Sequence, residues 1–257
     1  MTSVAVLSLK GGVGKTSTVL GLAGAALGRG VRTLVVDLDP QANATAALTG
    51  SVPGPDDAGV AGVLADPSTL RAAIRRSGWT DVDGLLDLVP GSPRTELFEN
   101  PDPTAGRQRR LRAALRAVDD YALVLLDCPP SLGRLTRNAL AAADRALVVT
   151  EPGLFGVHGA DRALTAITDA AAENPDLRAA GVLVNRYRDR SPEHRFRTQE
   201  LRALVGELLL EPPVPERTAI ARAQDFSAPL AAVTANGVPE LLARYDRLLD
   251  QVTRPMA

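Results

Sequence analysis

Short apolar runs recur along the chain, separated by stretches long enough for a helix. The runs that we expect to form buried strands are residues 4–9, 32–37, 85–89, 121–127, 145–150 and 181–185. A helical pattern follows the first run to about Gly28, with Gly30 as its stop. A strand, a helix and a second strand within about 35 residues form a βαβ unit, which requires parallel strands.

The rest of the chain continues the alternation of expected strands with loops and helices. Gly, Pro and Asp recur between residues 51 and 110, as at 53–57 and 100–103, and helices are expected over 107–118 and 239–252. We find no internal repeat and no linker. The pattern therefore predicts a single α/β domain over residues 1–257, with a doubly wound, mainly parallel sheet and helices on both faces.

Composition narrows the functional classes. With 45% hydrophobic and 23% charged residues, the 257-residue chain is typical of globular proteins, and 3% aromatics leave a core of Ala, Leu and Val. A net charge of −1 argues against a protein that coats nucleic acid by bulk charge. One cysteine excludes a disulfide framework and a four-cysteine metal site within one chain.

The hydrophobic pattern also indicates where in the cell the protein is located. No apolar run reaches the ~18–20 residues of a membrane span, and the N-terminus lacks the features of a signal peptide. The final helix has no basic cluster after it, so we expect it to pack on the sheet rather than to bind a membrane. A cytoplasmic protein without membrane contact is the expectation.

Lysine is rare and clustered. Of 29 Lys and Arg residues only two are lysines, Lys10 and Lys15, and both lie in one glycine-rich loop between the first strand and the first helix. An ammonium is a compact point charge on a flexible stem, so two retained lysines indicate two separate tasks in this loop.

The loop has the chemistry of a phosphate-binding site, although a plain tight turn is the alternative. Its residues are Lys10, Gly11, Gly12, Val13, Gly14, Lys15, Thr16 and Ser17. Backbone N–H groups before a helix bind phosphate oxygens, Lys15 would reach the β- and γ-phosphates, and the Thr16 hydroxyl would bind Mg²⁺. The ordinary G-x-x-x-x-G-K-[ST] pattern is not met, because Leu9 stands at its first glycine and Lys10 is additional.

The additional lysine and several later segments resemble the ParA/MinD group of ATPases. These segments are residues 36–45, with Asp-Pro-Gln at 39–41, then 126–132, with Asp-Cys-Pro-Pro at 127–130, and then 151–155 with Gly159, 184–186 and 213–217. The resemblance covers nearly the whole chain in order. It implies an ATPase that uses ATP and Mg²⁺, with the adenine bound by Asn185, Arg186, Val214, Pro215 and Glu216.

The resemblance also implies an ATP-bound homodimer. In the family the lysine at the position of Lys10 reaches the partner subunit's nucleotide, so Lys10, Lys15 and Asp39 are the catalytic candidates. Such a dimer binds double-stranded DNA without sequence preference on the nucleoid, and a ParB-like partner stimulates hydrolysis. The expected function is segregation of a chromosome or plasmid.

Acidic residues follow two of the expected strands. Asp39 is suited to orient the attacking water, and Asp127 is suited to hold Mg²⁺ through a water, so that Thr16, Asp39 and Asp127 form the candidate metal site. Capping of the next helix or turn is the alternative for Asp39 and Asp127. For Asp37, structural support and a place around the metal remain equally open.

Arginines provide the candidate DNA surface. Six lie between residues 186 and 202, where three acidic residues leave a charge of +3; a solvated face with internal ion pairs is the alternative. The DNA-binding candidates are Arg186, Arg188, Arg190, Arg195, Arg197, Arg217 and Arg222.

Two alternative functions remain open. One is an ATPase of the same fold that positions another cargo, such as an organelle or a protein complex. The other is an ATP-dependent metabolic ligase or synthetase, which would need its own acid and base groups, and the chain has only two histidines. Cys128 is expected to be a small buried residue rather than a catalytic thiol.

Overall fold

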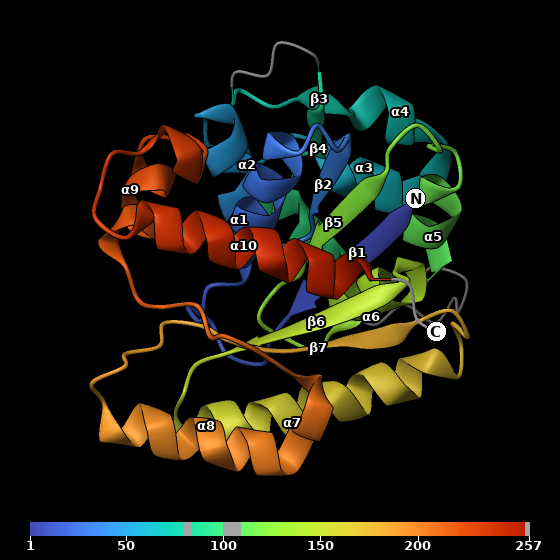
Figure 1. The fold of residues 1–257 in the computed structure, drawn as a ribbon. Helices are drawn as coiled ribbons and strands as arrows, with labels where there is room; N and C mark the ends of the chain where they lie inside the picture. The colour runs from blue at the N-terminus through green and yellow to red at the C-terminus, as the bar shows by residue number, and fades with distance from the viewer. Residues whose placement is uncertain (80–83, 100–108, 255–257) are drawn as a thin grey trace.

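A parallel sheet forms the centre of the molecule (Figure 1). The computed structural model describes residues 1–79, 84–99 and 109–254, and in these residues eight strands lie in the order β3-β4-β2-β5-β1-β6-β7-β8. The strands are β1 (Thr2–Leu7), β2 (Thr33–Asp37), β3 (Arg75–Arg76), β4 (Leu86–Val89), β5 (Leu123–Asp127), β6 (Arg145–Thr150), β7 (Arg178–Val184) and β8 (Leu209–Leu210). All neighbouring pairs are parallel except β3 and β4.

Helices connect the parallel strands, since a chain that re-enters a sheet in the same direction must cross over. The α-helices are α1 (Lys15–Gly28), α2 (Asn43–Thr49), α3 (Gly59–Ala65), α4 (Leu70–Ala73), α5 (Arg110–Leu115), α6 (Arg134–Ala142), α7 (Leu154–Ala171), α8 (Pro192–Val205), α9 (Thr218–Asp225) and α10 (Val238–Thr253). Short 3₁₀ turns are η1 (Pro67–Thr69), η2 (Pro93–Phe98), η4 (Gly206–Leu208) and η5 (Leu230–Ala232). In the described part of the chain, none of the helices is long and apolar enough to cross a bilayer.

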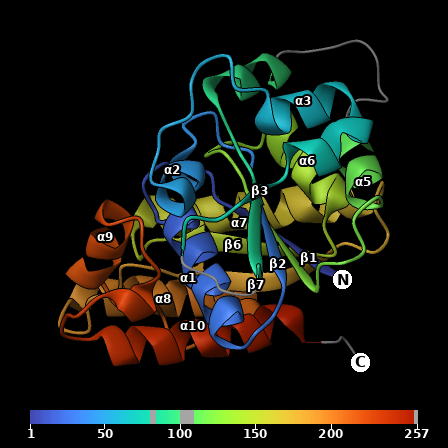
Figure 2. The ribbon, with the colours of Figure 1, turned by 90° about the horizontal axis from the view of Figure 1, so that it is seen from above.

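Alternating side chains of the strands build a core on each face of the sheet. Val4 and Val6 of β1 pack with α1, α2, α9 and α10, whereas Ala5 and Leu7 pack with α3, α5, α6, α7 and α8. Figure 2 shows α1, α9 and α10 on one side of the strands and α3, α5 and α6 on the other. The doubly wound α/β fold expected from the apolar runs is therefore confirmed.

Strand and helix positions agree with the sequence pattern within a few residues. The six expected strands correspond to β1, β2, β4, β5, β6 and β7, and the expected last helix corresponds to α10. Part of the expected helix at 107–118 and the turn at 100–103 lie outside the described residues. The edge strands β3 and β8 were not expected, because two residues are too few to produce a pattern.

Helix α1 contacts α10 closely through a glycine. A Cβ atom built on Gly21 would lie 2.3 Å from the ring of Tyr245, which is 2% exposed. The absent side chain lets the aromatic ring lie on the helix backbone. This contact attaches the C-terminal helix to the helix that begins at the glycine-rich loop.

Candidate active site

The glycine-rich loop joins β1 to α1 and borders a cavity of about 570 Å³. Gly12 (φ +78°) and Gly14 (φ +93°) have left-handed backbone conformations that favour glycine. A Cβ on Gly14 would also lie 2.1 Å from Nδ2 of Asn185. Gly11, Gly12, Gly14, Lys15, Thr16 and Ser17 line the cavity, whereas Val13 is buried in the core.

Lys15 is 6% exposed and lies at the cavity. A buried ammonium is costly unless an anion accompanies it. The first turn of α1 contains no acidic residue, so its backbone N–H groups and the ammonium face the cavity without a compensating carboxylate on the same helix. The loop therefore suits an anion such as a phosphate.

Two carboxylates meet where β2 and β5 end. Asp37 and Asp127 are paired across the two parallel strands, and Oδ2 of Asp127 accepts a hydrogen bond of 2.7 Å from the Thr16 hydroxyl. Oδ1 of Asp127 is buried and has no partner among the described residues. Burial raises the pKa of Asp127 well above its usual value, and the charge of Asp37 raises it further, whereas the Thr16 hydrogen bond and Lys15 oppose the rise.

This carboxylate fits a hard cation. Mg²⁺ takes oxygen ligands, and it usually binds proteins through one or two side chains together with phosphate oxygens and waters. Thr16, which lines the cavity, and the fully buried Asp127 bonded to it supply such oxygens, and Asp39 also lines the cavity at 6% exposure. Within the described residues, no group of three or more His, Cys, Asp or Glu side chains is suited to hold a metal by itself.

Asp37 supports the loop that carries Asp39. Its Oδ2 accepts hydrogen bonds from the backbone N–H (2.8 Å) and hydroxyl (2.7 Å) of Thr45, and its Oδ1 accepts one from the backbone N–H of Asp39 (3.2 Å). The Thr45 hydroxyl in turn accepts a hydrogen bond from the backbone N–H of Gly91. Both carboxylate oxygens of Asp37 thus accept hydrogen bonds from the protein, whereas Oδ1 of Asp127 accepts none from the described residues, so this geometry favours structural support over a place around the metal for Asp37.

Lys10 points away from the cavity that contains Lys15. Its Nζ lies 3.2 Å from Oε2 of Glu151, whose Oε1 lies 3.1 Å from Nη1 of Arg186. Lys10, Glu151 and Arg186 line a second cavity of about 640 Å³ on the other side of the loop. Phe155, at the start of α7, also lines this cavity and is 78% exposed.

The segments expected to bind adenine lie side by side. The backbone N–H of Tyr187 donates to the carbonyl of Val214, and the N–H of Glu216 donates to the carbonyl of Tyr187. Val214 and Pro215 are buried and line neither cavity, and the backbone N–H and carbonyl of Val214 are already hydrogen-bonded to Val184 and Tyr187. Arg186 lines both cavities, and Glu216 lines the one that contains Lys10.

Asn185 has an unused hydrogen-bond acceptor. Its Nδ2 donates to the carbonyl of Val13 in the loop, and its buried Oδ1 has no partner among the described residues. A buried acceptor without a donor is unfavourable, but Asn185 lines neither cavity, so its expected contact with adenine stays a prediction.

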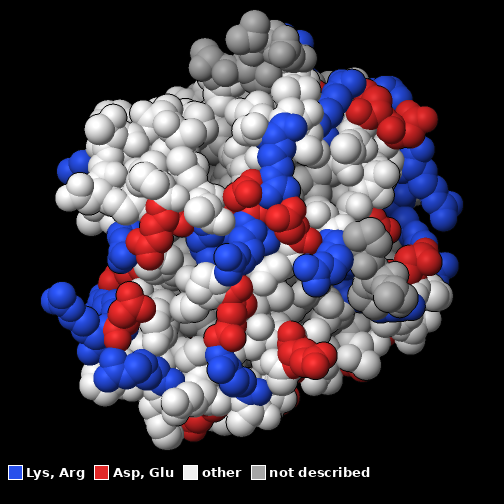
Figure 3. All heavy atoms as spheres, viewed as in Figure 1, with Lys and Arg blue, Asp and Glu red and all other residues white. Residues whose placement is uncertain are grey.

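Most of the candidate DNA-binding arginines are already paired. Ion pairs join Arg186 to Glu151, Arg188 to Glu216, Arg197 to Glu200 and Arg217 to Glu240, and Arg195 donates to the carbonyl of Asp189. In the described part of the chain, only Arg190 and Arg222 of the seven lack a hydrogen-bond or ion-pair partner. Basic and acidic side chains also interleave on the face shown in Figure 3.

Three residues that shape the site were not among those expected from the sequence. Thr45 and Gly91 hold Asp37 and its loop, and Glu151 is the partner of Lys10. Glu151 does lie directly after an apolar run, as Asp127 does. That position and the family-like segments 36–45 and 151–155, which contain Thr45 and Glu151, were the available signals, since the contacting residues are far apart in sequence.

Several known proteins are similar to this chain over most of its length. A family model described as an AAA domain matches residues 1–179. The chromosome-partitioning ATPase Soj of Thermus thermophilus is 36% identical over 97% of this chain and 94% of its own length. An identity of 36% over nearly the whole of both chains shows that they belong to the same protein family.

Solved structures are also similar. A Mycobacterium smegmatis protein described as cobyrinic acid a,c-diamide synthase, with bound ADP and magnesium, has a TM-score of 0.71 at 33% identity and covers 88% of this chain and 93% of its own. The ATP complex of a single-residue variant of Cyanothece McdA has a TM-score of 0.83 at 20% identity and covers 100% and 99% of the two chains. The second similarity concerns the fold alone.

Proposed function

The chain belongs to the ParA/MinD family of P-loop ATPases, in its chromosome-partition branch, and from this premise we propose that it binds ATP with Mg²⁺ and hydrolyses it to position a DNA cargo. The observation that carries the proposal is the Thr16–Asp127 hydrogen bond beside the buried Lys15, at the mouth of a glycine-rich loop. It combines a cation-binding pair and a phosphate-binding charge in one cavity.

Each group has a defined task in hydrolysis. Lys15 neutralises charge on the β- and γ-phosphates, and the loop N–H groups hold their oxygens. Thr16 and Asp127 would hold Mg²⁺, which would supply further neutralisation of the phosphate charge. Asp39 orients the attacking water, and its loop is held by the hydrogen bonds of Asp37. Phosphoryl transfer depends mainly on such positioning and charge neutralisation.

Lys10 does not face the cavity in which we propose that its own subunit binds ATP. It is directed to the neighbouring cavity, where Phe155 is exposed. We infer that a second copy of the chain covers this surface when ATP is bound, and that Lys10 then contacts the partner subunit's phosphates. The adjacent exposed side chains of Leu154 and Phe155 support this interpretation, since contiguous exposed apolar groups, unlike single ones, often mark interfaces.

The ATP-bound dimer is proposed to bind double-stranded DNA without sequence preference, and a ParB-like partner is proposed to stimulate hydrolysis. The net charge of −1 and the internal ion pairs leave few free arginines on one subunit. Dimerisation doubles these contacts, and nonspecific affinity rises with the number of phosphates neutralised. Association with the nucleoid would follow from this binding.

A second function is favoured by one comparison, the similarity to the protein described as an amide-forming synthase. Such an enzyme activates a carboxylate with ATP, so hydrolysis would depend on a small acid and an amine donor. Cys128, which follows Asp127, is not suited to serve such a reaction as a nucleophile, because it is buried and burial raises the pKa of its thiol.

Turnover without other substrates distinguishes these functions. We expect release of phosphate from ATP with Mg²⁺ alone, an increase when DNA and a ParB-type protein from the same genome are added, and loss of both in Lys15→Ala. Phosphate release that requires a carboxylic acid and an amine donor would instead identify a synthetase. Absence of any ATP binding would contradict both functions.

A further inference from the structure

The last residues of α9 form the far wall of the cavity at the phosphate-binding loop. Gln224, Asp225 and Ser227 line this cavity together with Ser17. Nε2 of Gln224 donates a hydrogen bond of 3.1 Å to the Ser17 hydroxyl. The cavity therefore extends past the loop to an amide and a carboxylate that the sequence pattern did not single out.

This wall lies on the side away from the metal-binding pair. Thr16 is bonded to Asp127, whereas the next residue, Ser17, contacts α9. A triphosphate held by the loop N–H groups has its γ-phosphate at the metal and its α-phosphate nearer Ser17. The group that follows the α-phosphate is the sugar of the nucleotide, so the sugar is the part that faces Gln224 and Asp225.

Asp225 is chemically suited to a sugar rather than to a phosphate. Its carboxylate is exposed, lines the cavity, and has no hydrogen-bond or ion-pair partner among residues 1–79, 84–99 and 109–254. A free carboxylate repels phosphate oxygens but accepts hydrogen bonds from hydroxyl groups, which are strengthened by its charge. In dinucleotide-binding folds an acidic residue accepts hydrogen bonds from ribose in the same way.

The end of α9 is held in place on two sides. Ala219 and Ala223 are buried in the core against the sheet. Beyond the helix, Ser227 has a positive φ of 47°, its hydroxyl is 3.5 Å from the carbonyl of Ala46 in α2, and Gly50 lies against it. A group on such a fixed element loses little conformational entropy on binding a ligand.

We propose that Asp225 accepts a hydrogen bond from the ribose 2′-hydroxyl of the bound nucleotide and thereby makes the site selective for ribonucleotides over 2′-deoxyribonucleotides. This inference rests on the proposed binding of ATP in the same cavity. Gln224 contributes by keeping Ser17, and with it the first turn of α1, at a constant separation from Asp225.

The test compares binding of Mg-ATP and Mg-2′-deoxy-ATP by calorimetry in the full chain. The unaltered protein is expected to bind ATP about tenfold more tightly, the effect of one charge-assisted hydrogen bond. Asp225→Ala should bind ATP as weakly as it binds 2′-deoxy-ATP, with the affinity for 2′-deoxy-ATP unchanged. Asp161→Ala, at an exposed carboxylate of α7 on the other face of the sheet, should keep the preference.

The outcomes separate the two proposals. Equal affinities in the unaltered protein, or a preference that persists in Asp225→Ala, would overturn the ribose contact while leaving the ATPase proposal intact. Failure of the unaltered protein to bind either nucleotide would overturn the proposed function and the ribose contact with it. Because Asp225 is exposed at a helix end, its replacement leaves the core unchanged, which thermal unfolding of the variant verifies.

Discussion

The ammonium group of Lys10 lies 3.2 Å from Oε2 of Glu151, a residue 141 positions further along the chain. The Lys10 side chain is 60% exposed and that of Glu151 24%, so the pair contributes little to stability, on the order of 0–1 kcal/mol. A lysine held this weakly can exchange its carboxylate partner for a triphosphate on a second subunit at small cost.

Replacement of each lysine should therefore have a different effect. Lys10→Ala is expected to bind ATP with an affinity close to that of the unaltered protein but to form no ATP-dependent dimer and to hydrolyse no ATP. Lys15→Ala should weaken ATP binding by roughly tenfold or more, because the charge partner of the phosphates is removed. Calorimetry measures the affinities, and light scattering measures the mass. An ATP-dependent dimer with full turnover in Lys10→Ala would exclude the contact across the interface.

Asp39→Ala should separate binding from turnover. The Thr16–Asp127 pair and the loop remain intact, so the variant is expected to bind Mg-ATP and to accumulate as a dimer. Without the group that orients water, turnover should fall by at least about 100-fold. Single-turnover phosphate release and light scattering check this expectation. Normal turnover would assign the water to another group, with Asp127 next to be tested.

DNA binding should depend on the unpaired arginines. Arg190→Glu and Arg222→Glu are expected to weaken binding of the ATP-bound protein to duplex DNA. Each should also reduce the slope of log K against log salt by about 0.9 for every phosphate that the variant no longer neutralises. Arg116→Glu, at the exposed end of α5, serves as the control. A surface-binding titration from ~50 to ~200 mM salt gives both quantities. Equal binding with ADP and with ATP would contradict a nucleotide-controlled switch.

Two glycines of α1 should respond in opposite directions to alanine. Gly21→Ala places a methyl group 2.3 Å from the Tyr245 ring, so we expect a loss of about 1–3 kcal/mol in the free energy of unfolding. Gly28→Ala meets no atom within 4 Å and should stabilise the protein by up to about 1 kcal/mol. Urea unfolding measures both. A neutral Gly21→Ala would show that α10 moves away from α1 without cost.

The buried Asp37 should make stability fall as pH rises in the absence of nucleotide and metal. Burial raises the pKa of Asp37 to about 6, and the charge of Asp39 adds to the rise while hydrogen bonds from Thr45 oppose it. Since this pKa exceeds the value in the unfolded chain, the stabilisation is complete below about pH 4 and is lost as pH rises through 6.

Asp37→Asn removes this titration, so the variant provides the reference. The free energy of unfolding of the unaltered protein, minus that of Asp37→Asn, should decrease by about 1–3 kcal/mol between pH 4 and 7. Urea unfolding at a series of pH values gives the difference. A difference that is constant with pH would mean that Asp37 stays ionised when buried.

The sequence predicts the central part of the fold well, because β1, β2, β5 and β6 are apolar runs of strand length on a buried sheet. It also predicts the glycine-rich loop between β1 and α1, because three glycines and both lysines of the chain lie there. It does not predict the two-residue β3, whose Arg75 and Arg76 are exposed and are held only by pairing with β4.

Contacts within the site were harder to predict, for a physical reason. The partner of Lys10 is Glu151, and the partner of Ser17 is Gln224. Each pair is formed by the order of strands in the sheet and by helix packing, and no local pattern of residues encodes either. Asp37 illustrates the same limit, because only its hydrogen bonds to Thr45 distinguish a support from a metal ligand.

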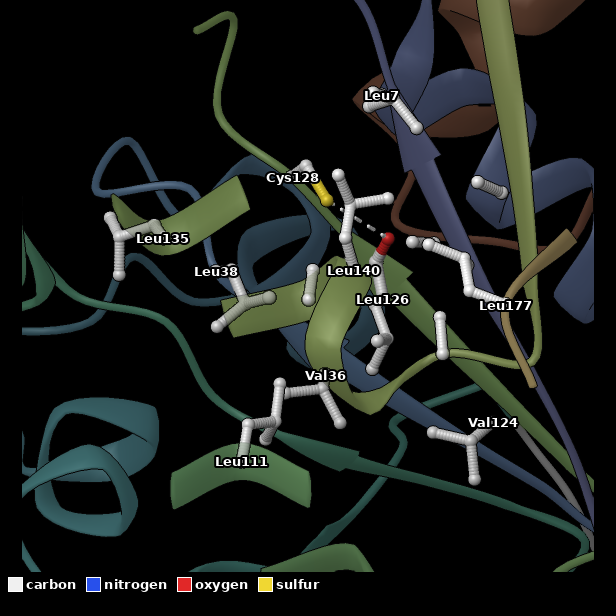
Figure 4. Close-up of a cluster of buried hydrophobic side chains, with 14 of the residues drawn as sticks. Leu7, Val36, Leu38, Leu111, Val124, Leu126, Cys128, Leu135, Leu140 and Leu177 are labelled. Atoms are coloured by element: carbon white, nitrogen blue, oxygen red, sulfur yellow. Dashed lines mark hydrogen bonds between the residues drawn. The ribbon is translucent and has the colours of Figure 1, made fainter. Parts of the chain in front are cut away.

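The position of Cys128 has a practical consequence for spectroscopy. The thiol is fully buried among Leu7, Leu126, Leu135 and other aliphatic side chains (Figure 4), and burial raises its pKa. Since thiolate and access are both needed for alkylation, maleimide reagents should leave the folded protein unmodified. A cysteine introduced at Phe155 or Arg222 would then be the one reactive thiol on the chain. Fluorescent or spin labels attached there can follow association of subunits and encounter with DNA without prior removal of the native cysteine.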